Sequence, residues 1–172
     1  VESFTLLEFS YAGRQTANIA FGQSTYPDPP AFAYSPLSGG DVWFDTTNYD
    51  FRNPRVGDYM YFAHFHEIGH ALGLKHPHEY EGADSTLLPS QYDWLGYSLM
   101  SYRAYAGDDL SGYTNETFGY PTSFMPADIL TLQTLYGADF QTNKTDTKYS
   151  WDPATGQFFI DGQGQAIPGS GT

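Results

Sequence analysis

The chain has 172 residues, which is enough for one domain with a buried core and too few for a second full domain. Its 20 acidic and 7 basic side chains give a formal charge of −13, which argues against nucleic acid or an anionic membrane surface as partners. The absence of cysteine excludes disulfides and thiolate metal ligands, and no apolar run reaches the length of a membrane span.

The first part of the chain predicts short strands separated by turns. Runs of β-branched and aromatic residues bounded by glycine or proline are typical of strands. The predicted strands are Phe4–Phe9, Ala17–Phe21, Ala31–Tyr34 and Asp41–Asp45.

A long helix is predicted next, with Asn53 as its N-cap and Pro54 at the first helical position, where the missing N–H costs nothing. Apolar residues keep a spacing of three to four from there to about Leu72. Gly73 ends the helix in the way that a glycine in the left-handed conformation would. The turn brings His76 back toward the helix.

The second half of the chain predicts loops, one helix and a hairpin. Pro77–Gly96 and Ala106–Pro121 have the composition of loops. Pro126–Gly137 predicts a short helix, because it begins with proline, carries an acid in its first turn and ends at glycine. Trp151 and Phe158–Ile160 predict a hairpin across the turn between them.

All five histidines of the chain lie between His64 and His78, and this clustering favours a metal site. Since His66 and His70 are four residues apart on one helix face, both rings can reach the same ion. His76 supplies a third ligand after the turn. Three neutral ligands leave an open coordination position, which is typical of a catalytic zinc rather than a structural one.

Glu67 is predicted to lie beside the metal rather than on it. A carboxylate there can take a proton from a zinc-bound water, whose pKa falls to about 7. The other two histidines are interpreted differently. His64 falls roughly on the far side of the helix and is expected to be packed or on the surface, and His78 follows Pro77 in a loop and is expected to be exposed.

Two stretches resemble the serralysin family of bacterial secreted proteases, within the metzincin zinc peptidases. They are HEIGHALGLKHP, from His66 to Pro77, and SLMSY, from Ser98 to Tyr102. The resemblance implies that the three histidines of the first stretch bind zinc and that its glutamate is the general base.

For the second stretch, the resemblance implies that Met100 forms a hydrophobic floor beneath the metal. It also implies that Tyr102 ligates zinc at rest and swings away to hydrogen-bond the tetrahedral intermediate. Without the resemblance, these residues would be interpreted as a core methionine and an ordinary tyrosine.

The resemblance implies an α+β, zincin-like fold with a twisted, mostly parallel sheet, an antiparallel edge strand, a long active-site helix, a Met-turn and a closing C-terminal helix. Residues 1–140 would form the protease domain, with an upper subdomain over 1–76 and a lower one over 77–140, and 141–172 would form a tail. The substrate edge strand is assigned to Asp41, Val42, Trp43, Phe44 and Asp45. An extended peptide can pair with such an edge through main-chain hydrogen bonds.

Two family features are not found in the sequence: a long helix before the first strand and a series of calcium-binding, glycine- and aspartate-rich repeats. Since the chain begins at Val1 with a strand-like pattern, we expect a fragment or a processed product, and a second chain as one source of the helix. Zinc is the expected cofactor and protein or peptide the expected substrate. Calcium and a secreted, extracellular location rest on the resemblance alone.

Two other functions remain open. One is a non-catalytic binding module in which zinc holds the loops together; Glu67 and the lack of a fourth histidine or cysteine ligand speak against it. The other is a zinc hydrolase acting on something other than peptides, against which only the predicted edge strand argues.

Overall fold

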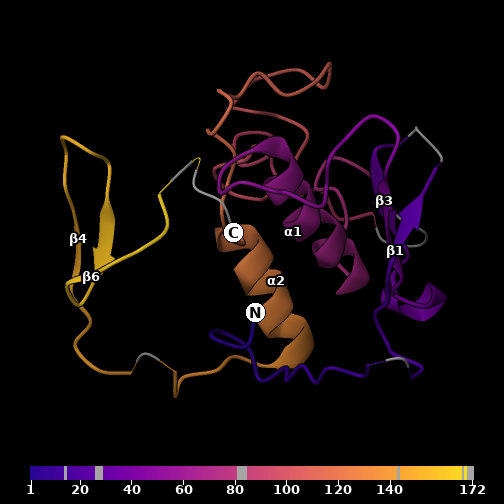
Figure 1. The fold of residues 1–172 in the computed structure, drawn as a ribbon, viewed down its shortest axis with the longest axis horizontal. Coiled ribbons are helices and arrows are strands. Elements are labelled where there is room, and N and C mark those ends of the chain that lie inside the picture. The colour runs from indigo at the N-terminus through magenta and orange to yellow at the C-terminus, as the bar shows by residue number, and fades with distance from the viewer. Residues whose placement is uncertain (14, 26–28, 81–84, 143, 168, 170–172) are drawn as a thin grey trace.

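A computed structural model describes residues 1–13, 15–25, 29–80, 85–142, 144–167 and 169. The described chain is α+β, with two α-helices and two three-stranded sheets (Figure 1). Its elements, in chain order, are β1 (Phe21–Ser24), β2 (Ala31–Ala33), the 3-10 helix η1 (Pro36–Ser38), β3 (Val42–Asp45), α1 (Tyr59–Ala71), α2 (Pro126–Tyr136), β4 (Tyr149–Trp151), β5 (Phe158–Ile160) and β6 (Gln163–Gly164).

The first sheet has the order β1-β3-β2, with a parallel β1–β3 pair and an antiparallel β2–β3 pair. Trp43 of β3 pairs with Gly22 on one side and with Phe32 on the other. The prediction that Asp41–Asp45 forms the sheet edge is therefore wrong. A largely apolar strand such as β3 suits the centre of a sheet, and the antiparallel edge strand is β2. The described sheet is mixed rather than mostly parallel.

The two strands predicted nearest the N-terminus differ from those observed. Phe4–Phe9 forms no strand, and only an isolated bridge joins Thr5 to Ala138. Ala17–Phe21 is extended only at its end, because the ladder with β3 starts where Val42 N–H donates to the carbonyl of Ala20. A strand needs a hydrogen-bonded partner, and sequence pattern alone does not supply one.

Helix α1 starts five residues after the predicted Pro54, at Tyr59. Gly57 has a positive φ of 83°, which interrupts the chain before the helix. The side chain of Asp58 then caps the helix by accepting from the N–H of Tyr61 at 2.7 Å. The predicted start at Asn53 is wrong because a better cap follows it.

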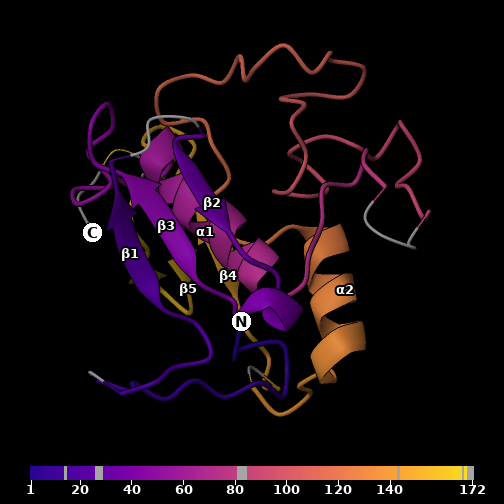
Figure 2. The same cartoon turned by 90° about the vertical axis from the view of Figure 1, so that its right-hand side faces the viewer.

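Helix α1 lies between the first sheet and α2 (Figure 2). It contributes buried residues to two clusters, one on each side, so it is buried along two faces rather than along one stripe. On the sheet side the cluster is Ala31, Val42, Phe44, Phe51, Ala63 and Ala71. On the other side it is Phe62, Leu72, Leu74, Leu95, Leu99, Met100, Phe124 and Leu132.

The tail forms the predicted hairpin, in which β4 pairs antiparallel with β5, and it adds the strand β6, which the sequence pattern did not indicate. In Figure 1 this second sheet stands apart from the helices. Tyr149 and Phe158 stack on it with ring centroids 6.1 Å apart. Among the described helices, neither is long and apolar enough to cross a membrane.

Candidate metal centre

Three imidazole nitrogens converge at the C-terminal end of α1. Nε2 of His76 lies 3.2 Å from Nε2 of His66 and 3.1 Å from Nε2 of His70. Two nitrogens bound to one tetrahedral zinc at 2.0–2.1 Å would lie about 3.3 Å apart. The three predicted ligands are therefore brought together at the spacing that one ion requires.

The opposite nitrogen of each ring fixes its orientation. Nδ1 of His66 donates to the carbonyl of Leu99, and Nδ1 of His70 donates to the carbonyl of Leu74, both at 2.9 Å. Since a carbonyl can only accept, the proton is on Nδ1 and the lone pair is on Nε2. Nδ1 of His76 likewise faces the Glu79 carboxylate at 2.8 Å.

Three lone pairs that face one another cannot hydrogen-bond to one another. They can share a cation, and the outer oxygen acceptors are the partners that metal-binding histidines usually have. The residues present therefore fit a metal ion of the zinc type.

A tight turn after α1 creates part of this geometry. Gly73 has a φ of 93°, and Leu74 N–H donates back to the carbonyl of Gly69 at 2.9 Å. The prediction that Gly73 ends the helix in the left-handed conformation is confirmed. The same turn places the Leu74 carbonyl beside His70.

Burial keeps His66 and His70 neutral. It holds the pKa of His66 well below its ordinary value, and the neighbouring His70 lowers it further. The pKa of His70 falls to about 4, mainly through burial and also through His76. At neutral pH these rings can therefore bind a cation without first losing a proton.

Glu67 lies beside the three histidines and outside their cluster. Its side chain is buried, and Oε2 has no hydrogen-bond partner. Burial raises the pKa of this carboxyl to about 8 in the metal-free protein. Together with His66 and Tyr102 it lines a hollow of about 210 Å³, where a water or a substrate could reach it. A buried carboxyl with a raised pKa in such a hollow is a candidate for proton transfer.

Met100 and Tyr102 both lie against the ligand histidines. Met100 is almost fully buried, and its Sδ is so near Gly69 that a Cβ there would lie 2.6 Å away. The ring centroid of Tyr102 is 4.4 Å from that of His76 and 5.9 Å from that of His66. The structure thus brings the second motif under and beside the first.

Asp128 is a positioning residue that the sequence reasoning missed. Its carboxylate accepts from Ser98 Oγ at 2.7 Å and from the N–H groups of Leu99 and Met125 at 2.9 Å. These bonds tie the start of α2 to the turn whose Leu99 carbonyl orients His66. The sequence pattern indicates only that this acid lies in the first turn of the helix, and it contains no sign of the contact with the turn at Ser98 and Leu99.

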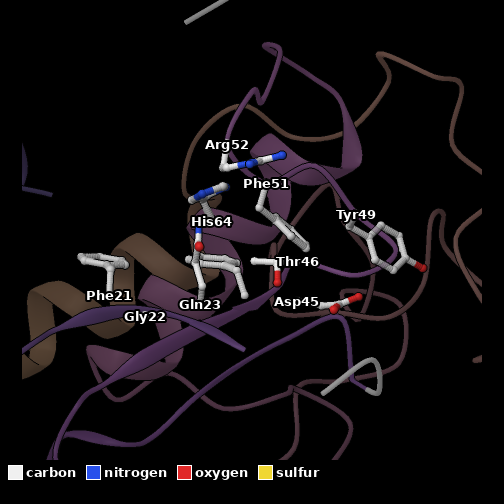
Figure 3. A pocket seen from close by; sticks show the side chains of 10 residues that line it. Phe21, Gly22, Gln23, Asp45, Thr46, Tyr49, Phe51, Arg52 and His64 are labelled. Atoms are coloured by element: carbon white, nitrogen blue, oxygen red, sulfur yellow. The ribbon is translucent and has the colours of Figure 1, made fainter. Parts of the chain in front are cut away.

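His64 is packed, as one of the two predicted alternatives stated. Its Nδ1 donates to the carbonyl of Met60 at 2.7 Å, and its ring lies 4.3 Å from that of Phe44 and 5.8 Å from that of Phe51. It borders a separate hollow of about 500 Å³ with Phe51 and Gln23 (Figure 3). It takes no part in the three-histidine cluster.

The prediction that His78 is exposed is wrong. Only 8% of its side chain is exposed. Its ring stacks on that of His76 at 5.6 Å and lies 5.1 Å from the ring of Tyr102. The turn after His76 folds the loop inward against these two rings.

Helix α1, the turn after it and the carbonyl acceptors thus place three histidines where they could hold one metal ion, in an α+β chain. No family model matches the sequence. The chain is 35% identical over 140 residues to a protein named metallopeptidase AprA from Pseudomonas marginalis, covering 76% of this chain and 29% of that protein. It is 35% identical over 162 residues to serralysin B of Dickeya chrysanthemi, covering 84% and 32%. A serralysin of Proteus mirabilis is 32% identical over 133 residues, covering 74% and 26%.

These matches show a serralysin-family relationship for this chain. The aligned part spans roughly a third or less of the length of these relatives. The expectation drawn from the two motifs is confirmed at the level of the family. Homologous metalloproteases also imply a metal cofactor and a metzincin fold.

Proposed function

We propose that this chain is the zinc-binding part of a secreted endopeptidase that hydrolyses peptide bonds of extended protein substrates. The observation that carries the proposal is the convergence of three Nε2 lone pairs next to the buried Glu67 carboxyl, whose Oε2 has no hydrogen-bond partner. Residues 1–140 would form the protease domain, and 141–172 would lead away from it. The extracellular location and any calcium requirement rest on the family relationship.

In this proposal His66, His70 and His76 would hold a zinc ion, which would supply Lewis-acid polarisation of the scissile carbonyl and of the attacking water. Glu67 accepts the proton from that water and then passes it to the leaving amine. Tyr102 donates its O–H to the oxygen on which negative charge develops. Its pKa, which burial raises to about 12, keeps this donor protonated at neutral pH.

The edge of β2 is the proposed docking strand for substrate, in place of β3. The Pro30 carbonyl accepts from Asp45 and the N–H of Tyr34 donates to Asp41, so these two residues face β3. Alternation along an antiparallel strand then directs the main-chain groups of Ala31 and Ala33 away from β3, toward the open edge.

No other described strand pairs on that side of β2. Ala31 lines the same hollow as His66 and Glu67, so a peptide strand added to this edge would lead into the metal centre. This connection favours a peptide over other hydrolysable substrates.

The proposal is tested by metal analysis and by hydrolysis of casein with and without a chelator. Glu67→Gln should keep zinc and lose turnover by about 10²–10⁴-fold, because only proton transfer is removed. The matched control is Glu8→Gln, which changes an exposed carboxylate in the N-terminal segment. Zinc binding without chelator-sensitive cleavage would instead support a non-catalytic binding module.

A further inference from the structure

His78 is a buried imidazole that the proposed reaction does not use. Only 8% of its side chain is exposed, and both Nδ1 and Nε2 lack a hydrogen-bond partner. Each nitrogen instead faces a carboxylate oxygen beyond hydrogen-bond distance, Oδ1 of Asp93 at 3.6 Å from Nδ1 and Oε1 of Glu79 at 3.8 Å from Nε2. Buried polar atoms are nearly always hydrogen-bonded, so this arrangement requires an explanation. This histidine belongs to a second group that could hold a metal ion, with His76 and Glu79.

The ring of His78, like that of His76, has a carboxylate on its Nδ1 side, although at a longer distance. Its Nδ1 faces Oδ1 of Asp93 at 3.6 Å, and Asp93 is itself buried and held by Ser101 Oγ at 2.6 Å and Arg103 Nε at 3.0 Å. A fixed carboxylate on the Nδ1 side favours the proton on that nitrogen. The lone pair is then on Nε2.

Nε2 of His78 lies 3.8 Å from Oε1 of Glu79. That separation is too long for a hydrogen bond. An ion about 2.0–2.2 Å from each atom would span it at a wide angle, and a small rotation of the exposed Glu79 side chain would bring the two atoms to the tetrahedral spacing of about 3.3 Å. The other oxygen of Glu79 already accepts from Nδ1 of His76, so Oε1 is the one directed toward His78.

We propose that His78 Nε2 and Glu79 Oε1 form a second, weaker site for a divalent transition-metal ion such as Zn²⁺, adjacent to the three-histidine centre. The imidazole and carboxylate ligands suit zinc better than magnesium or calcium, which prefer oxygen alone. With two protein ligands, water completes the coordination. The site is therefore weaker than the centre with three histidines.

The second ion acts on the first site through Glu79. Because Glu79 orients His76, an ion on the same carboxylate draws negative charge away from Nδ1 of that ligand. If the proposed peptidase function holds, excess zinc therefore lowers turnover. Zinc binding itself does not depend on that function.

The test is equilibrium dialysis of the metal-free chain against rising free Zn²⁺, with zinc measured by mass spectrometry and folding by circular dichroism. We expect two ions in the wild-type chain, one of which fills at much higher free zinc. His78→Ala should keep only the tight ion, and the control His64→Ala should keep both. His78→Gln retains a polar side chain of similar size and serves if the alanine variant does not fold.

A second ion that persists in both His78 variants, or a single ion in the wild-type chain, would overturn the second site. Neither result would affect the proposed function, which fails instead if His66→Ala retains the tight ion.

A second experiment measures peptide cleavage at rising concentrations of free zinc. The turnover of the wild-type chain should fall several-fold over the zinc concentrations at which the weak site fills. Cleavage by His78→Gln should stay level, and equal inhibition of both chains would contradict the coupling through Glu79.

Discussion

His64 and His66 stand two residues apart on helix α1, and each donates from Nδ1 to a carbonyl oxygen. For His64 the acceptor is Met60, in the same helix, and the ring packs against aromatic side chains of the sheet side. For His66 the acceptor is Leu99, 33 residues away in the turn that also carries Met100. Both rings are held in place, but only one lies among other lone pairs.

The comparison shows that what the free nitrogen of an imidazole meets decides whether that ring could serve as a metal ligand. Residues two apart on an α-helix point roughly 160° away from each other, since each residue turns the helix by about 100°. The face of His66 meets the returning chain after Gly73, which carries His76. The face of His64 meets Phe44 and Phe51, which offer no ligand.

The sharpest test of this difference is to remove each ring separately. His66→Ala should reduce bound zinc to background at low free zinc, because two of three ligands cannot hold the tight ion. His64→Ala should keep that zinc and instead lower the melting temperature, since it removes an aromatic contact in a packed region. Metal analysis and thermal unfolding with and without zinc measure both outcomes, because an ion bound only to the folded state stabilises it. Equal zinc loss in the two variants would remove the distinction between the faces.

Tyr102→Phe changes a residue beside the three clustered histidines without changing the histidines themselves. Loss of one donor to a developing oxyanion typically costs about 10²–10³-fold in kcat. We expect a decrease of that size with unchanged zinc content and folding, because the ring contacts with His66 and His76 are kept. Steady-state kinetics on a peptide substrate measures it. Unchanged kcat would make Tyr102 a packing residue.

Glu79→Gln should have a smaller effect. The carboxylate orients His76 from outside the metal centre, and removing such a partner typically costs about 10–100-fold in metal affinity or activity. Competition with a zinc chelator at low free zinc gives the affinity of the tight site alone. Glu116→Gln, an exposed change in the loop near Gly119, is the control. An affinity equal to that of the control would show that His76 needs no charged partner.

The sequence predicts the parts of this molecule that local spacing determines. The proposed ligand set lies within ten residues, and the turn at Gly73 and the start of α2 at Pro126 each depend on residues within one or two helical turns. The structure confirms the helix and the turn, and it brings the ligands together as expected.

The parts that were missed depend on long-range partners. Strand β3 is central because it pairs with two other strands. The side chain of His78 is buried because it contacts Tyr102, which lies in a later loop. The role of Asp128 likewise requires the turn at Ser98 and Leu99 to meet α2. Pattern along the chain contains none of these contacts.

On the sheet side, Asp45 predicts a small pH effect from a lowered carboxyl pKa, whereas burial raises the pKa of the Glu67 carboxyl beside the three histidines. Burial acts to raise the pKa of this carboxyl, but hydrogen bonds from Thr47 and Asn48 outweigh it, so the pKa is lowered in the folded chain. A lowered folded-state pKa gives stability that is present above the unfolded value of about 3.9 and is lost as the pH falls through the folded value. Asp45→Asn should therefore unfold more readily than the wild-type chain at pH 6, and the two should converge toward pH 3. Urea unfolding of the metal-free chains at both pH values measures this. A difference that stays constant with pH would assign the contribution of Asp45 to hydrogen bonding alone, without its charge.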